Sequence, residues 1–274
     1  PYSVAQATQI GTGFVDLLGI PANADSLLAV SIGGGATANS EVIIGLLPST
    51  NLEGVAVGNL AYADGGVVIG DNVCGVNGNV AIAIGPNSYA LGGSSIAIGT
   101  PSQGLLDATT ATATAATAVG YSSDATGAYA TALGANTTAN QTNATAIGSG
   151  AAATNTAATA VGFGASGTGE NSIAIGNAAT AQGLNTISIG TGNIVSGANS
   201  GAFGNPTTIV GTGTYSVGNI NGTIDANNSG VFGNNNTITG VLEGVRVIGN
   251  TNTVTASGAM VMGNNATVSA VDGV

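Results

Sequence analysis

A 14-residue repeat constrains this chain more than any other feature of its sequence. The phrase N-S-I-A-I-G at residues 171–176 returns in altered form, for example as S-S-I-A-I-G at 94–99, N-A-T-A-I-G at 143–148 and N-T-I-S-I-G at 185–190. The glycines that close these copies keep the same spacing without a break from Gly120 to Gly218. A short, fixed period predicts a protein built from stacked repeats.

The pattern inside each copy predicts strands. The residues three and one positions before the closing glycine are Ile, Val, Thr or Leu, and the residue between them is usually Ala, as in Ile173, Ala174 and Ile175. This period of two, with β-branched residues, is typical of a strand and not of a helix. A turn residue follows the glycine, often Asn as at Asn177, and Gly and Asn tolerate the left-handed conformations of tight turns. Each unit is therefore expected to contain two strands and two turns, one coil of an all-β parallel solenoid.

The residues expected to build the coils occupy the strand end and the corner of successive repeats. They are Ile98, Gly99, Val119, Gly120, Leu133, Gly134, Ile147, Gly148, Val161, Gly162, Ile173, Ile175, Gly176, Asn177, Ile189 and Gly190. So small a coil is expected to enclose one or two of the aliphatic side chains per layer, with alanine on the alternate face. Because neither strand face carries charge, one face is expected to be buried against identical copies.

Departures from the period divide the chain. Residues 1–28 precede the first repeat and are expected to form an N-terminal cap or irregular first turn, and residues 29–274 the repeats. The interval between Gly99 and Gly120 is longer than any other, which predicts a loop insertion near residues 100–114. After about residue 190 the second strand carries larger residues such as Val195, Ile209 and Ile238, so the cross-section is expected to change there.

Composition argues against several classes of function. The 274 residues contain 12 acids, no His and one base, Arg246, giving a formal net charge of −11. Phosphate binding needs clustered Lys and Arg, so a nucleic-acid partner is disfavoured and none is expected. Without His or Lys the common general bases are missing, and no enzymatic activity and no cofactor are expected. The acidic residues are spread along the sequence, and they are expected to be solvated charges on the surface.

Three further features favour structural roles over chemical ones. The glycine-rich turns are not phosphate loops because no Lys follows them, and Asp71 and Asp225 are too few for a calcium-binding solenoid, so no metal is expected. Cys74 is the single cysteine and is expected to be a small buried filler. Arg246 occupies a strand position that elsewhere holds Ile or Thr, and is expected to bond Glu243 or a neighbouring chain.

The phrase N-S-I-A-I-G with its 14-residue period, followed by an x-x-A-x-A-x-G half, resembles the head repeats of trimeric autotransporter adhesins, the YadA-like head family. The resemblance is strongest over residues 80–190. It implies a left-handed parallel β-roll assembled as a side-by-side homotrimer, exposed on the outer membrane of a Gram-negative bacterium. It also implies attachment to host extracellular-matrix proteins, cell surfaces or abiotic surfaces. No neck, stalk or translocating barrel is seen, so the chain is expected to be a head that reaches the membrane only through an anchor outside it.

The sequence is compatible with two other functional hypotheses. Stacked threonines at one strand position, Thr117, Thr131, Thr145 and Thr159, are also compatible with an ice-binding solenoid. A segment of a viral or phage fibre is a further alternative, because a fibre can be built from the same kind of stacked repeat.

Overall fold

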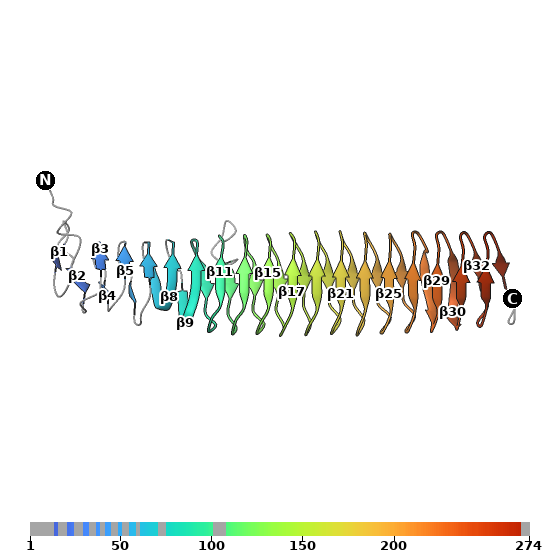
Figure 1. The fold of residues 1–274 in the computed structure, drawn as a ribbon, viewed down its shortest axis with the longest axis horizontal. Coiled ribbons are helices and arrows are strands. Elements are labelled where there is room, and N and C mark those ends of the chain that lie inside the picture. The colour runs from blue at the N-terminus through green and yellow to red at the C-terminus, as the bar shows by residue number, and fades with distance from the viewer. Residues whose placement is uncertain are drawn as a thin grey trace. The chain divides into compact units, whose positions relative to one another are not determined.

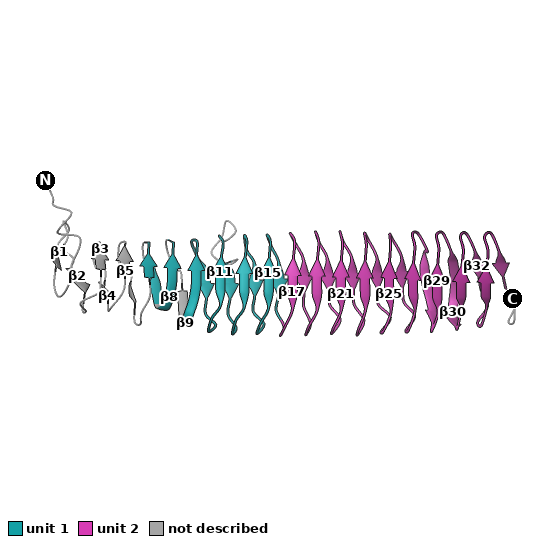
Figure 2. Ribbon diagram, viewed as in Figure 1, with its two compact units in different colours: residues 1–140 teal, residues 141–274 magenta. Residues whose placement is uncertain are grey.

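The computed structural model describes residues 55–58, 61–70, 75–100 and 108–269, together with strand segments at 14–15, 21–24, 30–32, 37–38, 42–44 and 49–50 (Figure 1). Within these residues all regular structure is β-strand. The chain divides into two compact units, residues 1–140 and 141–274 (Figure 2). Cys74, residues 101–107 and most of the predicted cap lie outside the described residues.

Each unit is a stack of coils with two parallel ladders. Ladder A contains the strands that end at the closing glycines, and ladder B the strands that follow the next turn. In the first unit, ladder A comprises β3 (Val30–Ile32), β5 (Val42–Ile44), β7 (Val55–Val57), the second parts of β8 (Tyr62–Ile69) and β9 (Gly75–Ile84), β11 (Ile96–Ile98), β13 (Thr117–Val119) and β15 (Thr131–Leu133).

Ladder B of the first unit begins with the one antiparallel pair among the described strands, β1 (Phe14–Val15) with β2 (Pro21–Ala24). It continues in parallel through β4 (Thr37–Ala38), β6 (Ser49–Thr50), the first parts of β8 and β9, β10 (Ser88–Ala90), β12 (Thr109–Ala111), β14 (Asp124–Ala125) and β16 (Thr138–Ala139).

The second unit repeats the arrangement. Its ladder A comprises β17 (Thr145–Ile147), β19 (Thr159–Val161), β21 (Ile173–Ile175), β23 (Ile187–Ile189), β25 (Gly201–Phe203), β27 (Tyr215–Val217), β29 (Gly230–Phe232), β31 (Arg246–Ile248) and β33 (Met260–Met262). Its ladder B comprises β18 (Ala152–Ala153), β20 (Ser166–Gly167), β22 (Thr180–Ala181), β24 (Ile194–Val195), β26 (Thr208–Ile209), β28 (Thr223–Asn227), β30 (Thr237–Glu243), β32 (Thr253–Val254) and β34 (Thr267–Val268).

The register confirms the predicted all-β parallel solenoid and its coil length. Thr159 pairs with Ile173, which pairs with Ile187, so equivalent residues of neighbouring coils are one 14-residue period apart. Across the long interval Ile96 pairs with Thr117, yet β12 keeps a regular place because Ser88 pairs with Thr109. The extra residues therefore lie between β11 and β12, in the first part of the predicted insertion.

Alanine, and not the larger aliphatic residues, is the main residue in the interior of the coils before about residue 190. Ala174, the middle residue of β21, is fully buried, whereas its neighbour Ile175 points outward and is 37% exposed. The expectation that the coil encloses Ile and Val, with alanine outside, is therefore wrong. Short turns hold ladders A and B so close together that only small side chains fit between them at normal packing density.

The interior widens in the later coils. Val195, Ile209 and Ile224 of ladder B are fully buried and pack in one cluster with Val231 and Val247 of ladder A. The three ladder B residues occupy the position at which the second strand changes from Ala to larger residues after about residue 190.

Polar side chains inside the widened coils complete the backbone hydrogen bonds of the corners. Asn236 donates through Nδ2 to the carbonyl oxygen of Gly249 at 2.8 Å, and its Oδ1 accepts from the backbone N–H of Asn252 at 3.1 Å. Asn252 repeats the first contact with Gly263 at 2.8 Å. Because a buried carbonyl without a partner is costly, these asparagines hold successive corners in register.

The corners explain the closing glycines. Gly176 has a φ of +129°, and a Cβ placed there would lie 2.2 Å from the carbonyl oxygen of Gly190 in the next coil. The left-handed residues of the two turns are the second after the closing glycine, Ala178 at φ 52°, and the first residue of the repeated phrase, Asn171 at φ 53°. Asn177, which sequence reasoning placed at the corner, does lie there, but Ala178 takes the left-handed conformation.

Candidate binding surfaces

In each unit the outward residues of ladder A form a surface, called face A. In the first unit it carries mainly aliphatic side chains: Val55, Val57, Val67, Ile69, Ile82, Ile84, Ile96, Ile98, Thr117, Val119, Thr131 and Leu133. Because parallel registered strands stack like with like, these side chains make two continuous apolar columns.

Face A of the second unit is apolar as well, with larger side chains toward its end. Phe232, Ile248 and Met262 are 50%, 53% and 76% exposed, and Tyr215 and Val217 are also exposed. Aromatic, Met and Ile side chains exposed side by side are unusual on a soluble surface and mark an interaction site.

Arg246 interrupts this apolar surface. Its Nη1 donates to the backbone carbonyl oxygens of Asn228, at 2.6 Å, and Val245, at 3.2 Å. Glu243, the predicted partner, instead accepts from Nδ2 of Asn228 at 2.6 Å. Within the described residues the arginine is thus held by backbone oxygens and not by Glu243, which corrects that part of the prediction.

A shallow hollow of about 450 Å³ lies beside Arg246. Its lining includes Tyr215, Gly230 and Phe232 of ladder A, together with the corner residues Gly213, Asn228 and Ser229. The hollow opens on face A, so it belongs to the same apolar surface.

The outward residues of ladder B form the opposite surface, face B, which is mostly polar. Thr110, Asp124 and Thr138 stack in one column, since β12, β14 and β16 pair in register. In the second unit the equivalent column holds Ala152, Ser166, Thr180, Ile194, Thr208, Thr223, Thr237, Thr253 and Thr267. Most of these coils therefore present an apolar side and a side that carries hydroxyl groups.

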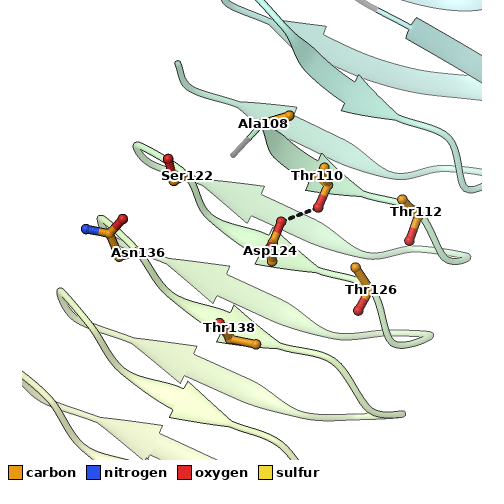
Figure 3. A pocket seen from close by; sticks show the side chains of 8 residues that line it. All are labelled: Ala108, Thr110, Thr112, Ser122, Asp124, Thr126, Asn136 and Thr138. Carbon is orange, nitrogen blue, oxygen red and sulfur yellow. Dashed lines mark hydrogen bonds between the residues drawn. The ribbon is translucent and has the colours of Figure 1, made fainter. Parts of the chain in front are cut away.

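Face B is hollowed in the first unit by a groove of about 550 Å³. Figure 3 shows its lining in three columns, one for each outward position of the coil, and the members are Ala108, Ser122 and Asn136; Thr110, Asp124 and Thr138; Thr112 and Thr126. The Thr110 hydroxyl donates a hydrogen bond to Oδ1 of Asp124. This polar groove is the second candidate site.

The predicted repeat residues occupy two places in the coil. The closing glycines, such as Gly162, lie at the corner, and the aliphatic residues before them, such as Val161, lie on face A. They hold the coil and its apolar side and do not converge on a pocket. Thr117, Thr131, Thr145 and Thr159 lie on face A beside aliphatic residues.

Sequence reasoning missed the groove, whose key residue is Asp124. The available signal was the alternation in Thr110-Ala111-Thr112 and Asp124-Ala125-Thr126, in which alanine marks the inward position and the polar residues mark the outward ones.

Metal-binding groups and membrane-spanning helices are two further features that bear on function. In the described part of the chain, no three His, Cys, Asp or Glu side chains are grouped so that they could hold a metal ion. Among those same residues there is also no helix with the length and hydrophobicity of a membrane span.

Comparison with known families adds one match. A model of the YadA head domain repeat, which spans two copies, matches residues 77–100, 111–137, 139–165 and 168–193. No curated protein matches the chain. The matched segments cover most of the strands from β9 to β23, but β20 and the groove residues Ala108, Thr110 and Thr138 lie outside them.

Proposed function

Residues 77–193 form a YadA-like head domain, and on this premise we propose that the chain is the adhesive head of a trimeric autotransporter on the surface of a Gram-negative bacterium. It attaches the cell to host extracellular-matrix proteins, to cell surfaces or to abiotic surfaces. Its role is binding and not catalysis, and it requires no cofactor.

The observation that carries this proposal is the difference between the two faces of the coil. Face A is apolar along both units and includes exposed Phe232, Ile248 and Met262. Covering such a surface with the same surface of identical chains removes apolar area from water and leaves face B outward. A left-handed roll packed side by side as a homotrimer has this arrangement.

The recognition surface is then face B with the corners. It is extended and repetitive, and it carries little charge, since the chain has 12 acids and one base. Such a surface binds through many weak, repeated contacts, whose combined strength grows with the number of copies. This favours adhesion over capture of one small molecule.

The threonines of face A do not favour the ice-binding alternative. Thr117 and Thr131 share face A with Val119 and Leu133. A side-by-side assembly would cover them, so they would not meet ice.

Adhesion is tested by displaying the full chain on bacteria that carry an unrelated stalk and anchor. We expect these cells to bind surfaces coated with matrix proteins or host cells, and cells displaying the stalk and anchor alone not to bind. Sedimentation of the purified chain should give three copies. A stable folded monomer would refute the assembly, and equal attachment of both cell types would refute adhesion.

A further inference from the structure

The groove on face B combines a single carboxylate with several hydroxyl groups. Asp124 lies in the middle column, with Thr110 before it and Thr138 after it in the ladder. The outer positions add Thr112 and Thr126, both exposed (Figure 3). Neighbouring coils repeat at the strand spacing, about 4.8 Å, so hydroxyl groups recur along the groove at regular intervals.

The hydrogen-bonding capacity of this lining suits a ligand rich in hydroxyl groups. Each threonine hydroxyl both donates and accepts, and an ionised carboxylate offers about four acceptor positions. Asp124 uses one of these for the Thr110 hydroxyl. Oxygens therefore remain to accept from two adjacent hydroxyls of one ligand, and charged acceptors of this kind form the stronger hydrogen bonds.

The charge of the groove argues against the other ligand classes. The groove contains no base and one acid, so a phosphate, sulfate or carboxylate group would meet repulsion without compensation. A basic peptide needs several acids, and a metal ion needs a group of ligands, while the lining offers one carboxylate.

An aromatic side chain extends the same column. Tyr89 pairs in register with Thr110 in the next coil and points outward. Aromatic rings pack well against apolar surface while keeping a polar end in water, so Tyr89 offers a platform for the C–H face of a sugar ring beside the polar row.

We propose that the groove lined by Thr110, Asp124, Thr126 and Thr138 binds a segment of a neutral glycan. The inference deepens the proposed function, on which it rests, by naming one receptor chemistry for the adhesin. The site remains exposed when face A is covered, because it lies on the opposite face of the coil. A single groove of this kind binds weakly, and many displayed copies strengthen the attachment.

The test uses the full chain and an array of neutral hexose and N-acetylhexosamine oligosaccharides, with sialylated and sulfated forms of the same sugars. Asp124→Asn keeps the size of the side chain and removes its charge, and Thr126→Val removes one hydroxyl. Thr180→Val is the matched control, since Thr180 occupies the equivalent strand position in a coil of the second unit, outside the groove. Circular dichroism and sedimentation confirm that the variants keep the fold and the assembly of the unsubstituted chain.

We expect neutral oligosaccharides to bind. Asp124→Asn should weaken binding about tenfold, the value of one charge-assisted hydrogen bond, and Thr126→Val about fivefold, the value of a neutral one, with no change for Thr180→Val. The proposal is overturned if no neutral glycan binds, if anionic forms or a basic peptide bind in their place, or if the groove variants bind as well as the control. Adhesion of displaying cells to matrix proteins is measured in parallel. Adhesion without glycan binding refutes the glycan site alone, whereas loss of both refutes the proposed function too.

Discussion

Replacing Gly176 by alanine is expected to destabilise the roll by about 4 kcal/mol, the sum of a conformational cost and weakened hydrogen bonds. The residue has a φ of +129°, and a strained conformation of this kind costs a residue with a side chain on the order of 2 kcal/mol. The new Cβ would lie 2.2 Å from the carbonyl oxygen of Gly190, so the two coils must move apart at this corner. That movement weakens two adjoining backbone hydrogen bonds, both 2.8 Å long. The N–H of Gly176 donates to the carbonyl oxygen of Val161, and the N–H of Gly190 donates to that of Ile175. Weakening each bond costs about 1 kcal/mol.

Gly164→Ala is the matched control one coil earlier. Gly164 also has a positive φ, +61°, but no atom lies within 4 Å of the position of its Cβ. The equivalent residue of the next coil is already an alanine, Ala178, at φ 52°. The control therefore isolates the cost of the conformation, on the order of 1 kcal/mol, from the cost of the close approach.

Urea unfolding followed by circular dichroism measures the difference, at equal protein concentration because assembly contributes to stability. Hydrogen exchange at the amides of Gly176 and Gly190 tests whether the loss is local to this corner. If Gly176→Ala lowers the free energy of unfolding no more than Gly164→Ala does, close packing of corners is not what requires the closing glycine.

Three further outcomes follow from the same structure. Ala174→Leu forces a large side chain into the coil and should lower the free energy of unfolding by about 2–3 kcal/mol. Ile173→Thr on face A should change that free energy by less than about 1 kcal/mol. Equal effects of the two variants would contradict the alanine interior. Asn236→Leu keeps the branched shape of the side chain but leaves buried backbone groups of the next coil without partners. Thermal unfolding should therefore show a loss of about 3 kcal/mol, and an unchanged melting curve would contradict that role. Phe232→Asp on face A should reduce the sedimenting mass of the assembly while Thr253→Asp on face B should not, and an intact trimer in the first variant would argue against face A as the contact.

The coil and its strands were predictable from the sequence because both depend on local patterns. The 14-residue spacing of the closing glycines gives the coil length, and the alternation around Ala174 gives the strand. The register then follows, since like residues stack on like residues in a parallel stack. The irregular coils were also marked by the spacing, although β12 shows that the long interval contains a regular strand.

Which side of each strand faces the interior was not predictable from hydrophobicity. Alternation shows that Ile173 and Ala174 point to opposite sides, but it does not say which side is the interior. The larger residue was assigned to the core because burying it contributes more free energy. The distance between ladders A and B determines instead which side of the strand faces the interior. That distance depends on both turns of the coil, and the alternation within one strand carries no information about it.

The groove escaped prediction for a related reason. Thr110, Asp124 and Thr138 are separated by whole repeats and look unremarkable in the sequence, since Thr and Asp are ordinary surface residues. Only the stacking of β12, β14 and β16 brings them into one column. A repeat protein builds its sites across coils, so the positions to compare are those one period apart and not those close in sequence.

The alanine interior connects the fold to the proposed assembly. An alanine side chain buries little apolar area, so in the regular coils the core contributes less hydrophobic free energy than an aliphatic core would. The larger apolar area of those coils lies on face A, with Ile175 as an example. Its contribution is gained only when face A is covered, so the proposed trimer would supply the stabilisation that the small core does not. Where the interior is larger, around Ile209 and Ile224, the coil itself supplies more. On this reasoning, disrupting face A should unfold the alanine-filled coils more readily than the later ones, and hydrogen exchange resolved along the chain would detect that order.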